Sequence, residues 1–282
     1  MRKLPPYFQA ILRRVLVGLV VLGLTLGSAA FAEEESAAED SDSAELAKKL
    51  QNPVAALISV PFQNNFEWGI GEKSRGFKYT LNFQPVIPIS ISEDWNVISR
   101  TIVPVIHQDD VVPGTQQGGL GDTTQSLFLS PKAPGPGGLI WGLGPVALIP
   151  TSTEDFLGAQ KWGLGPTAVL LRQSGGWTYG ILTNHIWSIG GTSATSDVNA
   201  TFLQPFLSYT TKTHTTFGVQ TESTYDWTNS KWTIPLIAPV SQLLRIGGLP
   251  ISLQAGPKLY VEGPSNAPDW GIRFAFIFLF PK

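Results

Sequence analysis

Residues 269–280 read D-W-G-I-R-F-A-F-I-F-L-F, and this stretch decides the fold class. With a period of two, one face carries only large apolar side chains: Trp270, Ile272, Phe274, Phe276, Phe278 and Phe280. The other face carries Gly271, Arg273 and Ala275, followed by Ile277 and Leu279. Such a strand suits a sheet with hydrocarbon outside and water or polar side chains inside. The alternative is a buried edge strand of a soluble β-protein.

The place of this stretch at the C-terminus also favours a membrane barrel. Outer-membrane β-barrels commonly end in an aromatic-rich strand that the assembly machinery reads, usually with Phe as the last residue. Here Pro281 and Lys282 follow Phe280. We therefore expect the barrel assembly machinery to be a partner of this strand.

Composition supports the same class and excludes several others. The chain has 282 residues, of which 14% are charged, against about 25% in soluble domains. Its net charge of −2 and the lack of a basic patch predict no binding to nucleic acid. Cysteine is absent, which excludes a disulfide framework, a thiolate zinc site and a cysteine nucleophile.

The N-terminal part predicts export. Residues 1–32 have a positive start, an apolar run at 15–26 and a small-x-small site at Ala30-Phe31-Ala32, as in a cleaved signal peptide. An uncleaved anchor is the alternative, but the run is shorter than the roughly 20 residues that span a membrane. Residues 33–43 are acidic and small, so we expect a solvated, disordered tail. Residues 44–50 suit a short helix that ends before Asn52-Pro53.

Residues 54–282 predict an all-β, antiparallel transmembrane β-barrel. Stretches rich in aromatic and β-branched residues alternate with clusters of Gly, Pro, Asn, Asp or Ser. We expect about twelve strands, at 54–68, 76–88, 94–107, 119–131, 138–149, 162–173, 176–190, 198–211, 214–228, 231–244, 249–262 and 269–280. These stretches are longer than ordinary strands and match tilted membrane strands. A β-sandwich would also alternate, but long strands, aromatic ends and low charge favour the barrel.

Polar side chains of one parity are the candidate lining of a lumen. A Lys or Arg facing lipid at the midplane would cost about 2–4 kcal/mol, so strand charges should face inward. The predicted lumen-lining residues are Glu67, Lys78, Asn82, Gln84, Gln220, Glu222, Gln254, Lys258 and Arg273. Arg100 lies mid-stretch, in a strand whose alternation is ambiguous. Because the charges have mixed signs, we expect no strong ion selectivity.

Other patterns describe the ends of the barrel. The odd-numbered connections, which face outside in bacterial barrels, are longer on average than the even-numbered ones. The nine Trp lie largely near the ends of stretches, as in an interfacial girdle. The repeat Trp-Gly-Leu-Gly-Pro at 141–145 and 162–166 marks positions where the wall bends. We expect Glu154-Asp155 and Asp109-Asp110 to be solvated loop charges; the alternatives are that they bridge divalent ions to lipopolysaccharide or screen charge at a pore mouth.

The sequence predicts no enzyme, cofactor or metal site. His107, His185 and His214 are scattered without metal-ligand spacing. Outer-membrane phospholipases use Asn, His and Ser on a barrel, and residues 184–188 contain all three. However, His185 and Ser188 fall on opposite faces of one strand, whereas a nucleophile and its base must lie within hydrogen-bond reach.

Several motifs carry a resemblance to a known family. They are L-A-K-K-L-Q-N-P-V-A-A-L-I-S-V-P-F-Q-N-N-F at 46–66, G-G-L-G-D at 118–122, the G-L-G-P segments and K-W-G-L-G-P-T at 161–167. The chain resembles a family of bacterial outer-membrane proteins often labelled "transporter" or, misleadingly, "neuromedin U". It is similar to the outer-membrane family named for the meta-pathway of phenol degradation. The resemblance implies a barrel that transports small, hydrophobic or aromatic compounds.

We therefore expect a porin-like protein of the Gram-negative outer membrane, in contact with its lipids and lipopolysaccharide. The leading hypothesis is a passive channel or uptake barrel for a small-molecule solute. The second is a non-conducting structural or adhesive barrel whose interior is filled by paired charges. The third is a lipid-modifying enzyme, which needs a convergent Ser/His or acid/His cluster near one rim.

Overall fold

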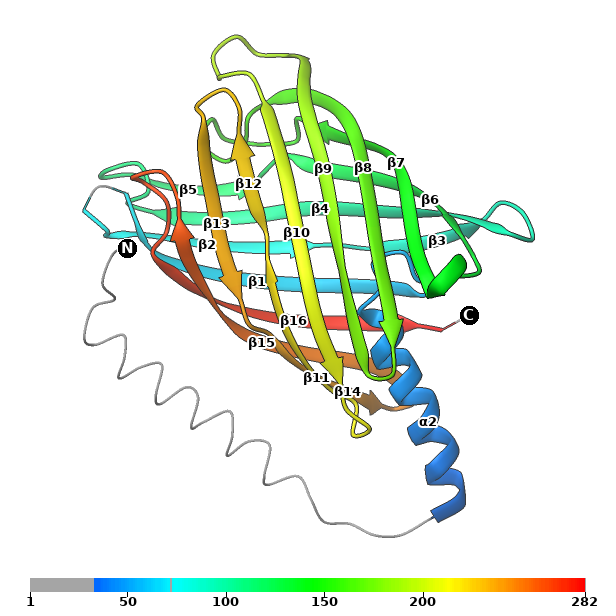
Figure 1. The fold of residues 1–282 in the computed structure, drawn as a ribbon. Helices are drawn as coiled ribbons and strands as arrows, with labels where there is room; N and C mark the ends of the chain where they lie inside the picture. The colour runs from blue at the N-terminus through cyan, green and yellow to red at the C-terminus, as the bar shows by residue number, and fades with distance from the viewer. Residues whose placement is uncertain (1–32, 72, 282) are drawn as a thin grey trace. The chain divides into compact units, whose positions relative to one another are not determined.

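One antiparallel sheet closes on itself into a barrel (Figure 1). The computed structural model describes residues 33–71 and 73–281, so the signal peptide predicted at 1–32 lies outside the described residues. The first strand, β1 (Ile58–Ile70), pairs with the last, β16 (Trp270–Phe280), from Ile58↔Phe280 to Trp68↔Trp270. This pairing removes the open edges that a flat sheet would present, and it confirms the all-β, closed-barrel class.

The remaining strands follow the chain around the wall. They are β2 (Gly76–Phe83), β3 (Val86–Ser90), β4 (Trp95–Asp109), β5 (Gln116–Leu120), β6 (Thr123–Pro131), β7 (Leu139–Ile149), β8 (Lys161–Ser174), β9 (Trp177–Gly191), β10 (Asn199–Thr210), β11 (Thr215–Thr221), β12 (Ser223–Asp226), β13 (Lys231–Ile237), β14 (Val240–Ile246) and β15 (Leu249–Glu262). A short 3₁₀ turn, η1 (Pro136–Gly138), precedes β7.

The described part of the sheet has sixteen strands, so the predicted count of about twelve is wrong. The difference arises because four of the predicted stretches, 76–88, 119–131, 214–228 and 231–244, are each divided into two strands. The breaks fall at Gln84-Pro85, Gly121-Asp122, Glu222 and Ala238-Pro239. Proline has no backbone donor for the ladder and glycine weakens a strand, which accounts for three of the four breaks.

Alternation separates the two faces of the wall. In β16, Phe274, Phe276 and Phe280 are exposed on the outside, whereas Arg273 and Leu279 are buried inside. The predicted faces of 269–280 are therefore confirmed. Trp68 stacks on Trp270 with ring centroids 4.5 Å apart, near the mouth where β1 ends and β16 begins. Trp95 and Trp141 meet at the other mouth, as an aromatic girdle requires.

The repeated Trp-Gly-Leu-Gly-Pro motif lies in the adjacent strands β7 and β8, where Pro145 pairs with Pro166. A Cβ at Gly144 would lie 1.9 Å from the carbonyl oxygen of Leu127, and a Cβ at Gly165 only 1.7 Å from that of His185. Only glycine permits backbones to approach this closely. The motif therefore lets the backbones of adjacent strands in the wall pack closely together.

The N-terminal helix is longer than predicted. Helix α2 (Glu33–Leu50) includes residues 33–43, where the sequence predicted a disordered tail. Its end agrees with the prediction, because it stops just before Asn52-Pro53. No helix in the described residues is both long and apolar enough to cross a membrane. Contacts divide the chain into Met1–Asp40 and Ser41–Lys282, and only the second unit, which contains the barrel, is considered below.

Candidate functional site

In the described residues, two ion pairs lie in the middle of the barrel interior, each with further hydrogen bonds. Arg273 donates from Nη1 and Nη2 to the two carboxylate oxygens of Glu222, both at 2.7 Å, and from Nε to Asn65 at 2.8 Å. Lys258 Nζ lies 2.7 Å from Glu67 Oε1, which also accepts a hydrogen bond from the Tyr260 hydroxyl. Bidentate and charge-assisted bonds of this kind are the strong ones. They fix these side chains across the lumen.

Amide side chains join these pairs to the neighbouring strands. Gln84 donates to Gln63 at 3.1 Å and Asn82 donates to the same oxygen at 3.3 Å. Gln84 also accepts a hydrogen bond from Arg100 Nη2 at 3.2 Å. Gln220 donates to Glu222 at 3.2 Å. The result is a polar layer in which few side chains are free to rotate.

The predicted lumen-lining residues are placed as follows. Strand register puts Lys78 opposite Glu67, and Gln254 opposite Ala275 on the inner side of β16. The other seven take part in the hydrogen bonds described above: Glu67, Asn82, Gln84, Gln220, Glu222, Lys258 and Arg273. Their common side follows from the alternation of each strand.

Sequence reasoning missed three members of this layer. Tyr260 was not assigned to a face, although it shares the parity of Lys258. Asn65 shares the parity of Glu67 but was not among the predicted lumen-lining residues. Arg100 was ambiguous by alternation, and its pairing with Val86 in β3 and Ser126 in β6 now places it on the inner side. Parity along β15 and β1 would have found the first two.

The inner charges do not balance. Four cations, Lys78, Arg100, Lys258 and Arg273, share the interior with two carboxylates, Glu67 and Glu222. The sequence predicted no strong ion selectivity because the charges have mixed signs, and ion selectivity stays a prediction. The middle layer of the described interior has more cationic than anionic side chains.

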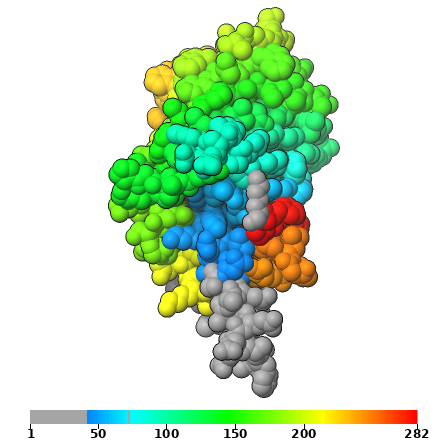
Figure 2. Space-filling model, turned by 90° about the vertical axis from the view of Figure 1, so that its right-hand side faces the viewer, coloured from blue at the N-terminus to red at the C-terminus, as the bar shows by residue number. Residues whose placement is uncertain are grey.

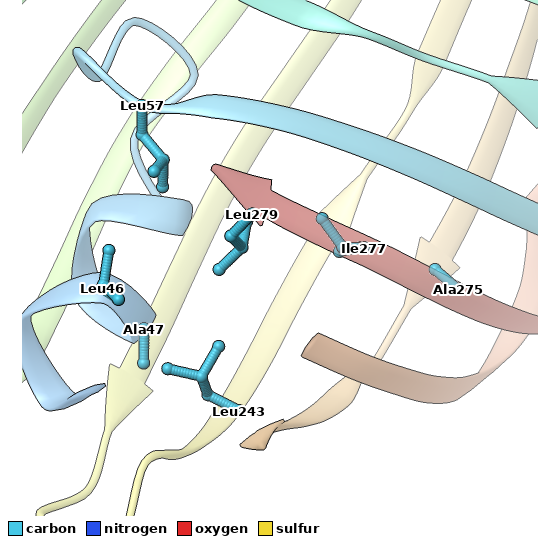
Figure 3. Packing of buried hydrophobic residues seen from close by; sticks show 7 residues of the cluster. All are labelled: Leu46, Ala47, Leu57, Leu243, Ala275, Ile277 and Leu279. Atoms are coloured by element: carbon cyan, nitrogen blue, oxygen red, sulfur yellow. The ribbon is translucent and has the colours of Figure 1, made fainter. Parts of the chain in front are cut away.

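One mouth of the barrel is filled by residues 42–57, termed the plug. This is the mouth where β1 begins and β16 ends, termed the terminal mouth, and Figure 2 shows the plug's blue atoms in its middle. Leu46, Ala47 and Leu57 pack with Leu243 of β14 and with Ala275, Ile277 and Leu279 of β16 (Figure 3). The inner face of β16 is thus polar at Arg273 and apolar where the plug covers it.

The plug reaches across to the opposite wall. Val54 is buried with Ile98 of β4, Phe128 of β6, and Val169, Leu171 and Leu182 of β8 and β9. Polar contacts add to this packing: Arg245 donates to Asp42 and Ser43, and Gln173 donates to the carbonyl of Lys48 at 2.8 Å. The plug therefore spans the lumen rather than resting on one wall.

A cavity of about 200 Å³ lies between the plug and the polar layer. Gln51, Asn52 and Pro53 of the plug form part of its lining. Arg100 and Glu222 line it from the polar layer, and Phe206 and Ile277 contribute apolar wall. The cavity is a candidate site because it combines charge, hydrogen-bonding groups and apolar surface within the lumen.

At the opposite mouth, hydrogen bonds hold the loop between β7 and β8 against the wall. Asp122, the last residue of G-G-L-G-D, accepts hydrogen bonds from the backbone N–H groups of Ser152 (3.2 Å) and Gln160 (2.9 Å). Leu157 of the same loop is buried. Nearby, Lys161 forms an ion pair with Asp197 at 3.1 Å. This motif holds the connection between β7 and β8 in place.

The candidate hydrolase residues do not converge. His185 Nδ1 lies 2.7 Å from the Thr201 hydroxyl, and its ring packs on Trp187. Ser188 Oγ instead accepts a hydrogen bond from the Val198 N–H. In the described residues this Ser and His therefore do not form a nucleophile–base pair.

These features define a porin-like β-barrel with a polar, partly filled lumen. The chain is similar in fold to the COG4313 outer membrane channel from Pseudomonas putida F1, with a TM-score of 0.61 and 14% sequence identity over 79% of this chain and 94% of that one. It also matches outer membrane phospholipase A from Escherichia coli, with a TM-score of 0.45 and 9% identity over 78% and 96% of the two chains. No protein-family model and no curated protein matches the chain.

Proposed function

We propose that this protein is an outer-membrane channel or uptake barrel through which small molecules diffuse passively, with the plug closing the terminal mouth at rest. The observation that carries the proposal is the cavity between the plug and the polar layer. In a barrel whose interior only stabilises the wall, we expect side chains to fill the lumen. A space of about 200 Å³ with charged and apolar walls therefore favours a channel. The fold similarity to the Pseudomonas putida protein, an outer membrane channel, supports the same class.

The family resemblance refines the proposal. It implies a small, hydrophobic or aromatic solute. Residues 1–32 add export by a signal peptide, and a barrel of this class would contact outer-membrane lipids and lipopolysaccharide. The exposed apolar wall is consistent with a lipid environment, because residues such as Phe276, Leu143 and Ile189 remain outside the barrel. On this proposal the longer loops face outward and the terminal mouth faces the periplasm.

The second candidate is a non-conducting structural barrel. The observation that favours it is the pairing of Arg273 with Glu222 and of Lys258 with Glu67, which fills the middle of the lumen. The two candidates differ in what happens when the plug leaves. A channel then conducts, whereas a filled barrel stays closed.

Single-channel conductance in planar bilayers tests this difference. Leu46→Asp places a carboxylate in an apolar cluster, so we expect it to release the plug and increase the open time. Glu45→Gln, at an exposed position of the same helix, is the matched control and should behave as the wild type. If both wild type and Leu46→Asp fold into heat-modifiable barrels without conductance, the channel is refuted in favour of the structural barrel.

A further inference from the structure

We propose that the cavity between the plug and the polar layer binds a small organic anion, a carboxylate on an aromatic or apolar body, and that Arg100 holds the carboxylate. This inference rests on the proposed function and names the class of solute. It comes from Arg100, the arginine of the cavity lining, which makes no ion pair in the described residues.

Arg100 has unused hydrogen-bonding capacity. A guanidinium has five N–H donors, and within the described residues Arg100 makes one side-chain hydrogen bond, from Nη2 to Gln84 at 3.2 Å. It forms no ion pair with any carboxylate in the described residues, whereas Arg273 is held by both oxygens of Glu222. The fork of a guanidinium matches a carboxylate, and a bound carboxylate would supply the missing partner.

Glu222 also lines the cavity, so its effect on an anionic ligand has to be considered. Both of its oxygens accept from Arg273 at 2.7 Å, and Gln220 donates to one of them at 3.2 Å. Its charge is therefore compensated locally. The excess of cations in the layer leaves the field at Arg100 attractive to an anion and unfavourable to a cation.

The rest of the lining suits a flat apolar body. Phe206, Val86, Ala275 and Ile277 line the cavity, and Leu50 of the plug lines it as well. Sites for drug-sized ligands have volumes of about 300–1,000 Å³, so a cavity of about 200 Å³ fits a smaller molecule, of the size of one aromatic ring with its acid group.

Equilibrium binding to the purified, detergent-solubilised protein tests the inference. The probes are benzoate, benzamide and benzylamine, which keep one ring and change the charge of the polar group. Measured by titration calorimetry, the wild type should bind benzoate at least about tenfold more tightly than benzamide, because hydrogen bonds between ionised partners are the stronger ones. Benzylamine should bind more weakly than benzamide.

Two variants and a control locate the effect. Arg100→Gln should abolish the preference for benzoate over benzamide, and Arg100→Lys should keep part of it. Arg172→Gln removes the same charge at an exposed position of β8 outside the cavity and should bind benzoate as the wild type does. Heat-modifiability confirms folding of each variant, and the comparison of probes on the wild type stands if Arg100→Gln fails to fold.

Three results would overturn the inference: no binding of benzoate to the wild type, equal binding of benzoate and benzamide, or full benzoate affinity in folded Arg100→Gln. Conductance recorded from the same preparation separates this inference from the proposed function. If the barrel conducts but does not bind benzoate, the carboxylate site is refuted and the channel is not. A barrel that binds benzoate through Arg100 but never conducts, even with Leu46→Asp, supports the site and refutes the channel.

Discussion

Replacing Glu222 by glutamine removes the counter-charge of Arg273 while keeping the size of the side chain. The Arg273 side chain is 2% exposed and Glu222 is 22% exposed, with 2.7 Å between Nη1 and Oε1. Breaking a buried ion pair by removing one partner costs about 3–5 kcal/mol, because the remaining charge is left buried without compensation. We expect Glu222→Gln to lower the free energy of unfolding by that amount.

The matched control is the Glu45–Lys49 ion pair, which has the same N–O distance but is much more exposed to solvent. Glu45 and Lys49 also lie 2.7 Å apart, with side chains 63% and 50% exposed. Glu45→Gln should therefore cost only about 0.3–0.5 kcal/mol. The double variant Glu222→Gln/Arg273→Met removes both charges and should lose less stability than Glu222→Gln alone.

The assay is reversible unfolding in urea from lipid vesicles, followed by tryptophan fluorescence, with heat-modifiability as a check of the folded state. Equal costs for Glu222→Gln and Glu45→Gln would refute the reasoning, because burial would then not decide the strength of the pair. A double variant less stable than Glu222→Gln would refute it too.

Three further perturbations test the rest of the barrel. Gly144→Ala places a Cβ against the Leu127 carbonyl and should lower the free energy of unfolding by about 1–3 kcal/mol, while Gly190→Ala, which meets no atom within 4 Å, should leave it unchanged. Asp122→Ala removes an acceptor from the loop at 150–160 and should speed amide hydrogen exchange there, measured by mass spectrometry. The hydrogen bond from Lys161, and next that from Ser188, lowers the pKa of Asp197. The ionised carboxylate therefore stabilises the native state above its ordinary pKa, and this stabilisation is lost as the pH falls through the lowered pKa. Lys161→Met should raise the pKa of Asp197 measured by carboxyl NMR, and an unchanged pKa would contradict the assignment.

The fold was readable from the sequence because membrane strands alternate over long distances. The alternation in residues 269–280 predicted which side chains lie on each face of the strand, and the structure confirms that prediction. The number of strands was not readable, because a bulge or a proline interrupts the hydrogen-bonded ladder without interrupting the path of the wall. Ala238-Pro239 is an example: the Gly218 N–H bonds to the Pro239 carbonyl, yet β13 and β14 are separate strands.

The candidate site was only partly readable. Parity predicted which charges point inward, but it carries no information about which strands face each other across a lumen. Arg273 and Glu222 meet although 51 positions separate them, and nothing local to either predicts that contact. The cavity was also beyond reach, because it depends on where residues 49–57 lie inside the barrel.

The inner face of β16 shows how wall and plug depend on each other. Ile277 and Leu279 are apolar residues at inward-facing positions of the strand, where the sequence otherwise has small or charged residues. Apolar side chains that faced open water there would be unfavourable. In the structure they pack against Leu46 and Leu57. Removing the plug would expose the apolar surface of the plug and that of the wall to water, at a free-energy cost of about 25 cal/mol per Å² of apolar area. Burial of this apolar surface therefore favours the closed mouth.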